Sequence, residues 1–109
     1  MPSEPLGILL EAGSHSRAHY AFVLASGAAA LGRTVVLFAT NAGCHALLKN
    51  WSGLTDANRD KTLAERGVAG LDVLREAASE LSVRMIACEA GLRAEALETA
   101  KKWLEAYAK

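Results

Sequence analysis

The chain of 109 residues has a mass of 11.5 kDa, which corresponds to one domain that can bury a core of its own. Hydrophobic residues make up 51% of it and charged residues 22%, a composition that excludes a disordered protein. Twelve basic side chains balance twelve acidic ones, so the basic excess typical of proteins that bind nucleic-acid phosphates is missing.

The first half of the chain predicts a strand followed by a helix. Residues 6–11 form a short apolar run that is typical of a strand buried on both faces. Ser14 or Ser16 can cap a helix over residues 17–31, and Gly32 ends it. The interior of this helix has no charge, so we expect it to be buried on more than one side, against the sheet and a neighbouring helix or subunit.

A second strand and a more irregular region follow. Residues 34–40 are β-branched and aromatic without interruption, which predicts a strand. A short helix is predicted over residues 44–51. Residues 52–66 are highly charged and weakly patterned, so we expect a solvated loop, with room for a helical turn, that is the most mobile element.

The second half predicts a helix, a strand and a last helix. Residues 68–81 are amphipathic, with Arg75 among the polar residues opposite the apolar face. Residues 83–87 predict a third strand. The last helix places these apolar residues on one face: Leu92, Ala96, Ala100, Trp103 and Tyr107.

This order of elements predicts an α/β fold. Strands that alternate with helices form a mostly parallel sheet with right-handed crossovers. We therefore expect a single domain over residues 1–109, with helices on both faces of the sheet in a three-layer, flavodoxin-like arrangement. Residues 1–54 hold five charged side chains against nineteen in residues 55–109, so the first half is expected to form the sheet core or face another subunit.

Reactive side chains follow each predicted strand. In an open parallel sheet, ligands bind beyond the carboxyl ends of the strands. His15 follows the first strand, Cys44 and His45 follow the second, and Cys88 follows the third. The third histidine, His19, lies one helical turn beyond His15. The sequence thus predicts that both cysteines and at least two histidines share one edge.

Cys88 is the first candidate for a catalytic residue. It lies between a strand and a helix start, where backbone amides can stabilise a thiolate, although a buried structural cysteine fits the same place. Cys44 is a possible second thiol or a structural one. His15 is a candidate base, a donor to an anionic sulfur, or an exposed residue at the helix start. Glu89 would raise the pKa of Cys88 if its charge came close.

Other chemistries lack their motifs. Zinc could use the atoms of His15, Cys44, His45 and Cys88, but no closely spaced ligand pair is present. The chain has neither a G-x-G-x-x-G run nor a G-x-x-x-x-G-K-[ST] loop for a nucleotide, and no G-x-S-x-G elbow for a catalytic serine. We therefore expect no metal and no cofactor.

The sequence also predicts where the protein resides. No apolar run approaches the ~20 residues of a membrane span, and no basic segment precedes the first apolar stretch, so neither a membrane anchor nor a signal peptide is expected. Two cysteines are too few for a small domain held by disulfides. We expect a cytoplasmic protein whose cysteines remain thiols.

The hydrophobic frame of the chain resembles the DsrE/DsrF-like family. The resemblance rests on residues 7–11, on the Ala- and Gly-rich helix that ends at residues 30–32, and on residues 35–40. It extends to residues 81–88, where a strand delivers Cys88 into a loop. It covers roughly residues 6–98. The chain departs from the family at its end, where helical residues replace the further strand that members usually have.

The resemblance implies both an assembly and a function. Family members are parallel α/β domains that form oligomers, often trimers or hexamers, and some carry sulfur as a cysteine persulfide. By its place after the strand, Cys88 matches their active cysteine. The expected function is therefore sulfur handling, in which Cys88 receives a sulfur atom and passes it to a partner protein. The alternative is a non-enzymatic oligomeric binding or assembly module with structural cysteines.

Overall fold

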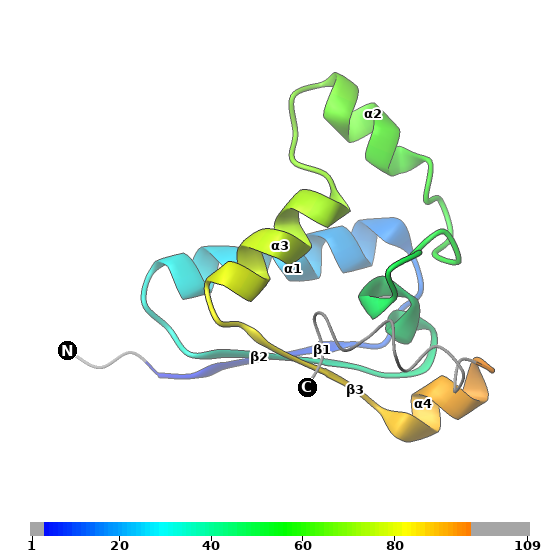
Figure 1. The fold of residues 1–109 in the computed structure, drawn as a ribbon, viewed down its shortest axis with the longest axis horizontal. Coiled ribbons are helices and arrows are strands. Elements are labelled where there is room, and N and C mark those ends of the chain that lie inside the picture. Colours follow the sequence, from blue (N-terminus) through cyan, green and yellow to red (C-terminus); the bar gives the residue numbers. More distant parts are fainter. Residues whose placement is uncertain (1–3, 97–109) are drawn as a thin grey trace.

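The computed structural model describes residues 4–96. Three strands form a parallel sheet in the order β1 (Leu6–Leu10), β2 (Val35–Ala39) and β3 (Arg84–Ala87). Helices connect the strands (Figure 1). The α/β class and all three predicted strands are therefore confirmed.

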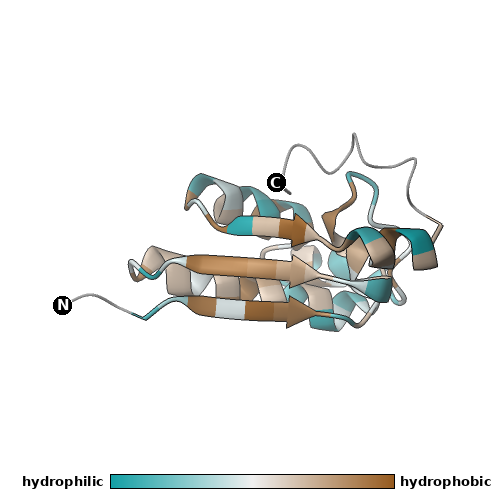
Figure 2. Cartoon of the chain, turned by 90° about the horizontal axis from the view of Figure 1, so that it is seen from below, coloured by the Kyte–Doolittle hydropathy of each residue, from teal (hydrophilic) through white to brown (hydrophobic). Residues whose placement is uncertain are grey.

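Two helices pack against each other and against one face of the sheet (Figures 1 and 2). They are α1 (His15–Ala30) and α3 (Leu71–Glu80). The core between these layers contains Phe22 of α1, Leu37 of β2 and Met85 of β3, which are at most 1% exposed. Burying an apolar side chain of this size contributes about 1.5–3 kcal/mol, so this shared core holds the sheet and both helices together.

The ends of α1 follow the local signals in the sequence. Ser14 caps the helix by accepting a hydrogen bond from the backbone N–H of Arg17 at 3.3 Å. At the other end, Gly32 has a φ of +89°, the left-handed conformation that glycine adopts without a steric penalty.

The opposite face of the sheet is not covered by a helix within residues 4–96 (Figure 2). Leu9 and Phe38 point to this side and are 68% and 37% exposed. The described residues thus form a sheet and one helical layer. Within the same range, no helix has the length and apolar content needed to cross a bilayer.

The segment after β2 is a 3-10 helix, η1 (Asn41–Leu47), which begins and ends earlier than the predicted helix over residues 44–51. Its turn is tight because Gly43 lies against β1. An added Cβ at Gly43 would lie 2.2 Å from the carbonyl oxygen of Leu10. The N–H of Gly43 donates to the carbonyl of Glu11 at 2.9 Å, which joins η1 to the end of β1.

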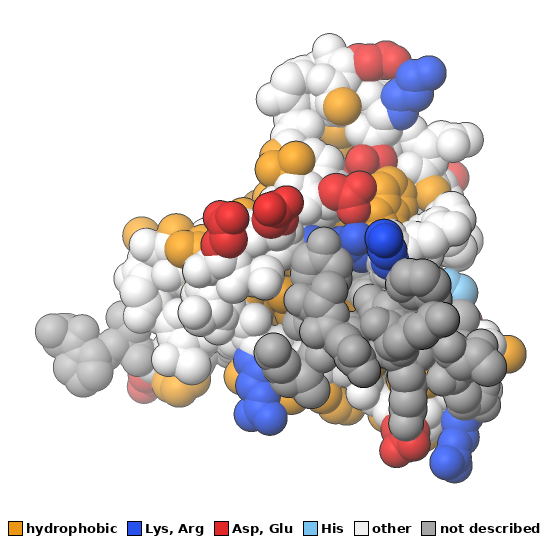
Figure 3. All heavy atoms as spheres, in the orientation of Figure 1, with side chains coloured by type: hydrophobic (Ala, Val, Ile, Leu, Met, Phe, Trp, Pro, Cys, Tyr) orange, Lys and Arg blue, Asp and Glu red, His pale blue; other side chains and the backbone are white. Residues whose placement is uncertain are grey.

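The charged region predicted as a solvated loop contains a helix, α2 (Arg59–Glu65). None of its residues is buried, and it projects from the body of the molecule (Figure 1). Charged side chains gather over α2 and α3 (Figure 3), which are both built from the charge-rich second half of the chain.

Two predictions about the later helices are wrong. Arg75 does not lie on a solvated face of α3, because its side chain is only 1% exposed. The helix after β3, α4 (Glu89–Ala94), begins before Leu92 and ends before Ala96. Ala96 has a φ of +56°, which is incompatible with a continuing helix. The remaining residues of the predicted apolar face, Ala100, Trp103 and Tyr107, lie outside the described residues.

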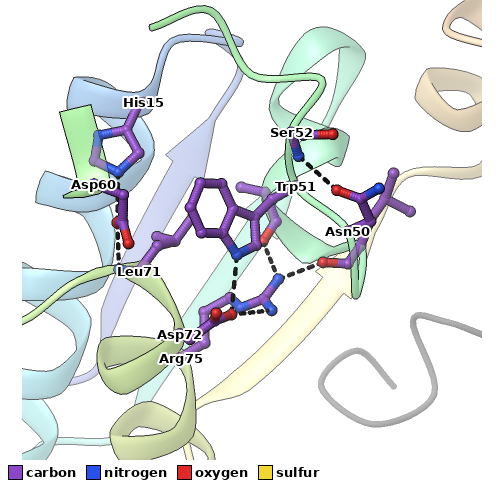
Figure 4. Close-up of polar contacts among 10 residues, drawn as sticks. His15, Asn50, Trp51, Ser52, Asp60, Leu71, Asp72 and Arg75 are labelled. Atoms are coloured by element: carbon purple, nitrogen blue, oxygen red, sulfur yellow. Dashed lines mark hydrogen bonds and ion pairs between the residues drawn. The ribbon is translucent and has the colours of Figure 1, made fainter. Parts of the chain in front are cut away.

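Arg75 is buried because it satisfies backbone carbonyls. Its guanidinium donates to the carbonyl of Ala46 at 3.0 Å and to the carbonyl of Leu48. It also pairs with the carboxylate of Asp72 at 2.9 Å (Figure 4). Arg75 therefore joins α3 to the end of η1 and to the residue that follows it.

We expect Arg75→Ala to lower the free energy of unfolding by on the order of 3 kcal/mol, because it leaves buried carbonyls without a donor and opens a cavity. Glu76→Ala is the matched control on the exposed side of the same helix and should change stability by less than about 0.5 kcal/mol. Urea titration followed by circular dichroism measures both. Equal stability of the two variants would contradict the anchoring role of Arg75.

Candidate functional site

The carboxyl ends of β2 and β3 bring the two cysteines to one place. Cys44 lies in η1, and Cys88 is the residue that precedes α4. The backbone N–H of Cys88 donates to the carbonyl of Ala39 at 2.8 Å, and the Sγ atom of Cys44 lies 3.7 Å from the same oxygen. Both are free thiols. They form, with Thr40, Ala90 and Gly91, what we call the thiol cluster.

Hydrogen bonds to sulfur distinguish Cys88. The backbone N–H of Gly91 and the hydroxyl of Thr40, with a smaller contribution from the N–H of Ala90, lower the pKa of the Cys88 thiol below its ordinary value. Partial burial and the carboxylate of Glu89 act in the opposite direction but do not outweigh these donors. Donors that bind the charged form of a thiol stabilise it, so these contacts favour the thiolate of Cys88 over its neutral form.

Cys44 has the opposite character. Its side chain is fully buried, and this burial raises the pKa of its thiol. The negative charge of Cys88 raises it further, and the backbone N–H of Cys88 offsets only part of the effect. Because the two thiols interact, ionisation of Cys88 helps to keep Cys44 protonated.

Gly91 makes this arrangement possible. An added Cβ at this position would lie 2.5 Å from the backbone nitrogen of Asn41 and 3.1 Å from the Sγ atom of Cys44. The first turn of α4 therefore approaches η1 more closely than any other residue type allows, and this approach places the Gly91 amide beside Cys88.

A second polar contact joins the same two elements. The Nε2 atom of His45 lies 3.2 Å from a carboxylate oxygen of Glu95, the residue at the end of α4. Both side chains are partly exposed. This pair closes η1 onto α4 at the far end of the helix from Cys88.

The structure gives His15 a different environment. Its side chain is fully buried, so an exposed place at the helix start is excluded. Its Nε2 atom lies 2.7 Å from a carboxylate oxygen of Asp60 (Figure 4). Its ring stacks on that of His19, with centroids 5.7 Å apart. Neither thiol is among its hydrogen-bond partners. The role of His15 as a base or anion stabiliser stays a prediction without a contact to support it.

Asp60 was missed by sequence reasoning. It accepts hydrogen bonds from His15 and from the backbone N–H of Leu71, both at 2.7 Å. One carboxylate thereby ties the exposed helix α2 to the starts of α1 and α3. Its place within a charged stretch gave no signal, because the partners are 45 and 11 residues away.

Thr40 was also missed. It is the residue after β2, next to the end of β3, and it supplies the hydroxyl that bonds to Cys88. The sequence could have indicated this role, because Thr40 is a polar residue at the carboxyl end of a strand and therefore lies at the same edge of the sheet as Cys88.

The described residues offer little for a metal. Within residues 4–96, no group of three or more His, Cys, Asp or Glu side chains is placed to hold an ion. A cleft of about 610 Å³ lies beside Trp51 and Asp72. The indole N–H of Trp51 donates to Asp72 at 2.9 Å within it (Figure 4), and neither cysteine lines it.

Comparisons with known proteins do not assign the chain. No protein-family model matches it, and no significant match is found among curated proteins.

Thiol chemistry follows from this geometry. We expect Cys88 to react with iodoacetamide with a pH inflection below that of an ordinary cysteine, because its donors stabilise the thiolate. In a Cys88→Ser variant, the remaining Cys44 should react slowly and only at higher pH. Thr40→Val should move the Cys88 inflection to higher pH, since it removes a donor to the anion. The exposed Thr34→Val is the matched control.

Measuring the rate of alkylation between pH 5 and 10 by mass spectrometry tests this. An unchanged inflection in Thr40→Val, or a Cys88 rate equal to that of a free cysteine throughout, would contradict the assigned donors.

The hydrogen bonds by which Asp60 holds α2 to α1 and α3 can be tested by limited proteolysis. Asp60→Ala leaves the buried His15 and the Leu71 N–H without their acceptor, at a cost of about 1–3 kcal/mol for each group. We therefore expect α2 to detach locally and trypsin to cut at its basic residues several-fold faster. Glu65→Ala, on the exposed side of the same helix, should leave the rate unchanged. Equal cleavage of the two variants would show that Asp60 does not hold the helix.

Proposed function

We propose that this protein handles sulfur through Cys88. The observation that carries the proposal is the set of donors around its sulfur: two backbone amides and the Thr40 hydroxyl lower the pKa of a thiol that remains partly exposed. The same donors suit a persulfide, whose outer sulfur is also an anion. The hydrophobic frame that resembles the DsrE/DsrF-like family supports the same function.

The chemistry requires no cofactor. The Cys88 thiolate attacks the outer sulfur of a donor persulfide, the donor's sulfur–sulfur bond breaks, and the donor leaves as a thiolate. A sulfur–sulfur bond forms on Cys88, so the transfer is balanced without an added oxidant. A thiolate of the acceptor protein then attacks the outer sulfur in the same way and releases Cys88.

The character of Cys44 fits this relay. Attack by Cys44 on a Cys88 persulfide would produce a disulfide and release sulfide. A protonated thiol is a poor nucleophile, so the raised pKa of Cys44 disfavours that loss. We assign Cys44 as the neighbour that holds α4 and η1 together, with the capacity to act as a second thiol at higher pH.

The wider setting belongs to the same proposal. We infer a cytoplasmic protein, where thiols stay reduced, that forms a single domain and assembles as a homo-oligomer. The family resemblance favours a trimer or a hexamer. The open apolar face of the sheet, with Leu9 and Phe38 exposed, supports assembly, which would complete the three-layer arrangement.

Loading with a persulfide donor tests the function. The wild type should gain the mass of one sulfur atom, and cyanide or a reductant should remove it. Cys88→Ser should lose the adduct, whereas Cys44→Ser should keep it. Thr40→Val should load more slowly. Equal loading of Cys88→Ser and wild type, or no loading of any form, would overturn the relay.

The alternative is a non-enzymatic oligomeric binding or assembly module with structural cysteines. It is favoured by the apolar surface of the first half, where Leu9 and Leu31 are 68% and 82% exposed. Alkylation of Cys88 at the rate of a free thiol, together with intact assembly, would favour this module over the relay.

A further inference from the structure

The outer edge of β1 presents unpaired backbone groups. Leu6 donates to the carbonyl of Thr34 at 2.9 Å, and Leu10 accepts from the N–H of Thr40 at 3.0 Å, so these residues point their backbone groups toward β2. Successive residues in a strand alternate in this direction. Gly7 and Leu9 therefore turn their N–H and C=O groups outward, and no strand within residues 4–96 pairs with them.

An apolar groove runs beside this edge. It has a volume of about 640 Å³ and lies between β1 and the flank of α1. Leu9, Leu24 and Leu31 line it and are 68%, 44% and 82% exposed. An added Cβ at Gly7 or at Gly27, which also line the groove, would meet no atom within 4 Å, so the described residues leave open space at both positions.

The groove lacks the charges that usually protect an edge strand. Among its described lining residues, the only charged one is Arg33, whose Nε atom donates to the carbonyl of Glu4 at 2.8 Å at the rim. Natural edge strands are commonly protected by charges, prolines or bulges. The other edge strand, β3, carries the exposed charge of Arg84, whereas β1 carries none.

We propose that this groove, which we call the β1 edge, binds a second copy of the chain about a two-fold axis. The β1 strands would pair antiparallel, so that the outward groups of Gly7 bond to those of Leu9 in the partner copy. One sheet would then continue across both copies, and the two α1 helices would pack beside each other through Leu24 and its neighbours.

The absence of charge selects a second copy over an unrelated partner. A two-fold axis places the same patch against itself, so a charge near the axis would face its own like charge. An uncharged apolar patch is complementary to itself, and interfaces between identical subunits are the more apolar class. The charge-poor first half of the chain, with five charged side chains in residues 1–54, builds β1, α1 and β2.

This contact goes beyond the sulfur chemistry and does not depend on it. Cys88 follows β3, at the edge of the sheet opposite β1, so pairing through β1 leaves the thiol cluster open to another protein. A two-fold contact produces dimers or even-numbered assemblies such as a hexamer, and is incompatible with an isolated trimer.

Sedimentation velocity and light scattering at micromolar concentration test the contact. The wild type and Cys88→Ser should both have an even multiple of the monomer mass. Leu24→Lys, which places like charges across the axis, should reduce that mass by half or more. Val73→Lys is the matched control, since Val73 is 61% exposed on α3 and outside the groove. It should keep the wild-type mass.

Amide hydrogen exchange measured by NMR gives an independent readout that requires no variant. The amides of Gly7 and Leu9 should be protected at high concentration and exchange many-fold faster on dilution, while the amide of Ile8, which points toward β2, stays protected. A monomeric or trimeric wild type, an unchanged mass in Leu24→Lys, or concentration-independent exchange at Gly7 and Leu9 would each overturn the proposal.

Discussion

Two glycines bring the segments after the strands into contact at the carboxyl edge of the sheet. Gly43 lies against the carbonyl of Leu10, and Gly91 lies against the backbone of Asn41 and the sulfur of Cys44. Any side chain at either position would push these segments apart. The donors around Cys88 come from the same segments, so the close backbone approach determines the electrostatics of the site as well as its shape.

The contrast between the two thiols follows from a small difference in place. The side chain of Cys44, within η1, is fully buried, and this burial favours the neutral thiol. Cys88 lies in the same cluster but is partly exposed to solvent, and hydrogen-bond donors surround its sulfur. The carboxyl edge of the sheet thus holds one thiol whose pKa is lowered beside another whose pKa is raised, a contrast that suits the proposed transfer of sulfur through Cys88 alone.

The sequence predicts features whose causes are local. The strands are apolar runs, and the helix cap at Ser14 and the turn at Gly32 depend on neighbouring residues alone. The features that the sequence predicts wrongly or does not predict depend on contacts between residues far apart in the chain. Arg75 is buried because of carbonyls 27 and 29 residues away, and the pairing of His15 with Asp60 spans 45 residues. Periodicity cannot show such partners, because it records only which face of an element is apolar.

The same difference between local and distant contacts explains which parts of the candidate site the sequence predicts. Strand ends placed Cys44 and Cys88 at one edge, because parallel strands point their carboxyl ends the same way. The sequence does not show the direction of each side chain, so His15, whose ring bonds to Asp60, could not be distinguished from residues that face the thiols. The chain thus concentrates its cysteines at the carboxyl ends of β2 and β3 and leaves its uncharged surface along β1. Assembly through β1, as proposed, therefore leaves the partly exposed Cys88 uncovered.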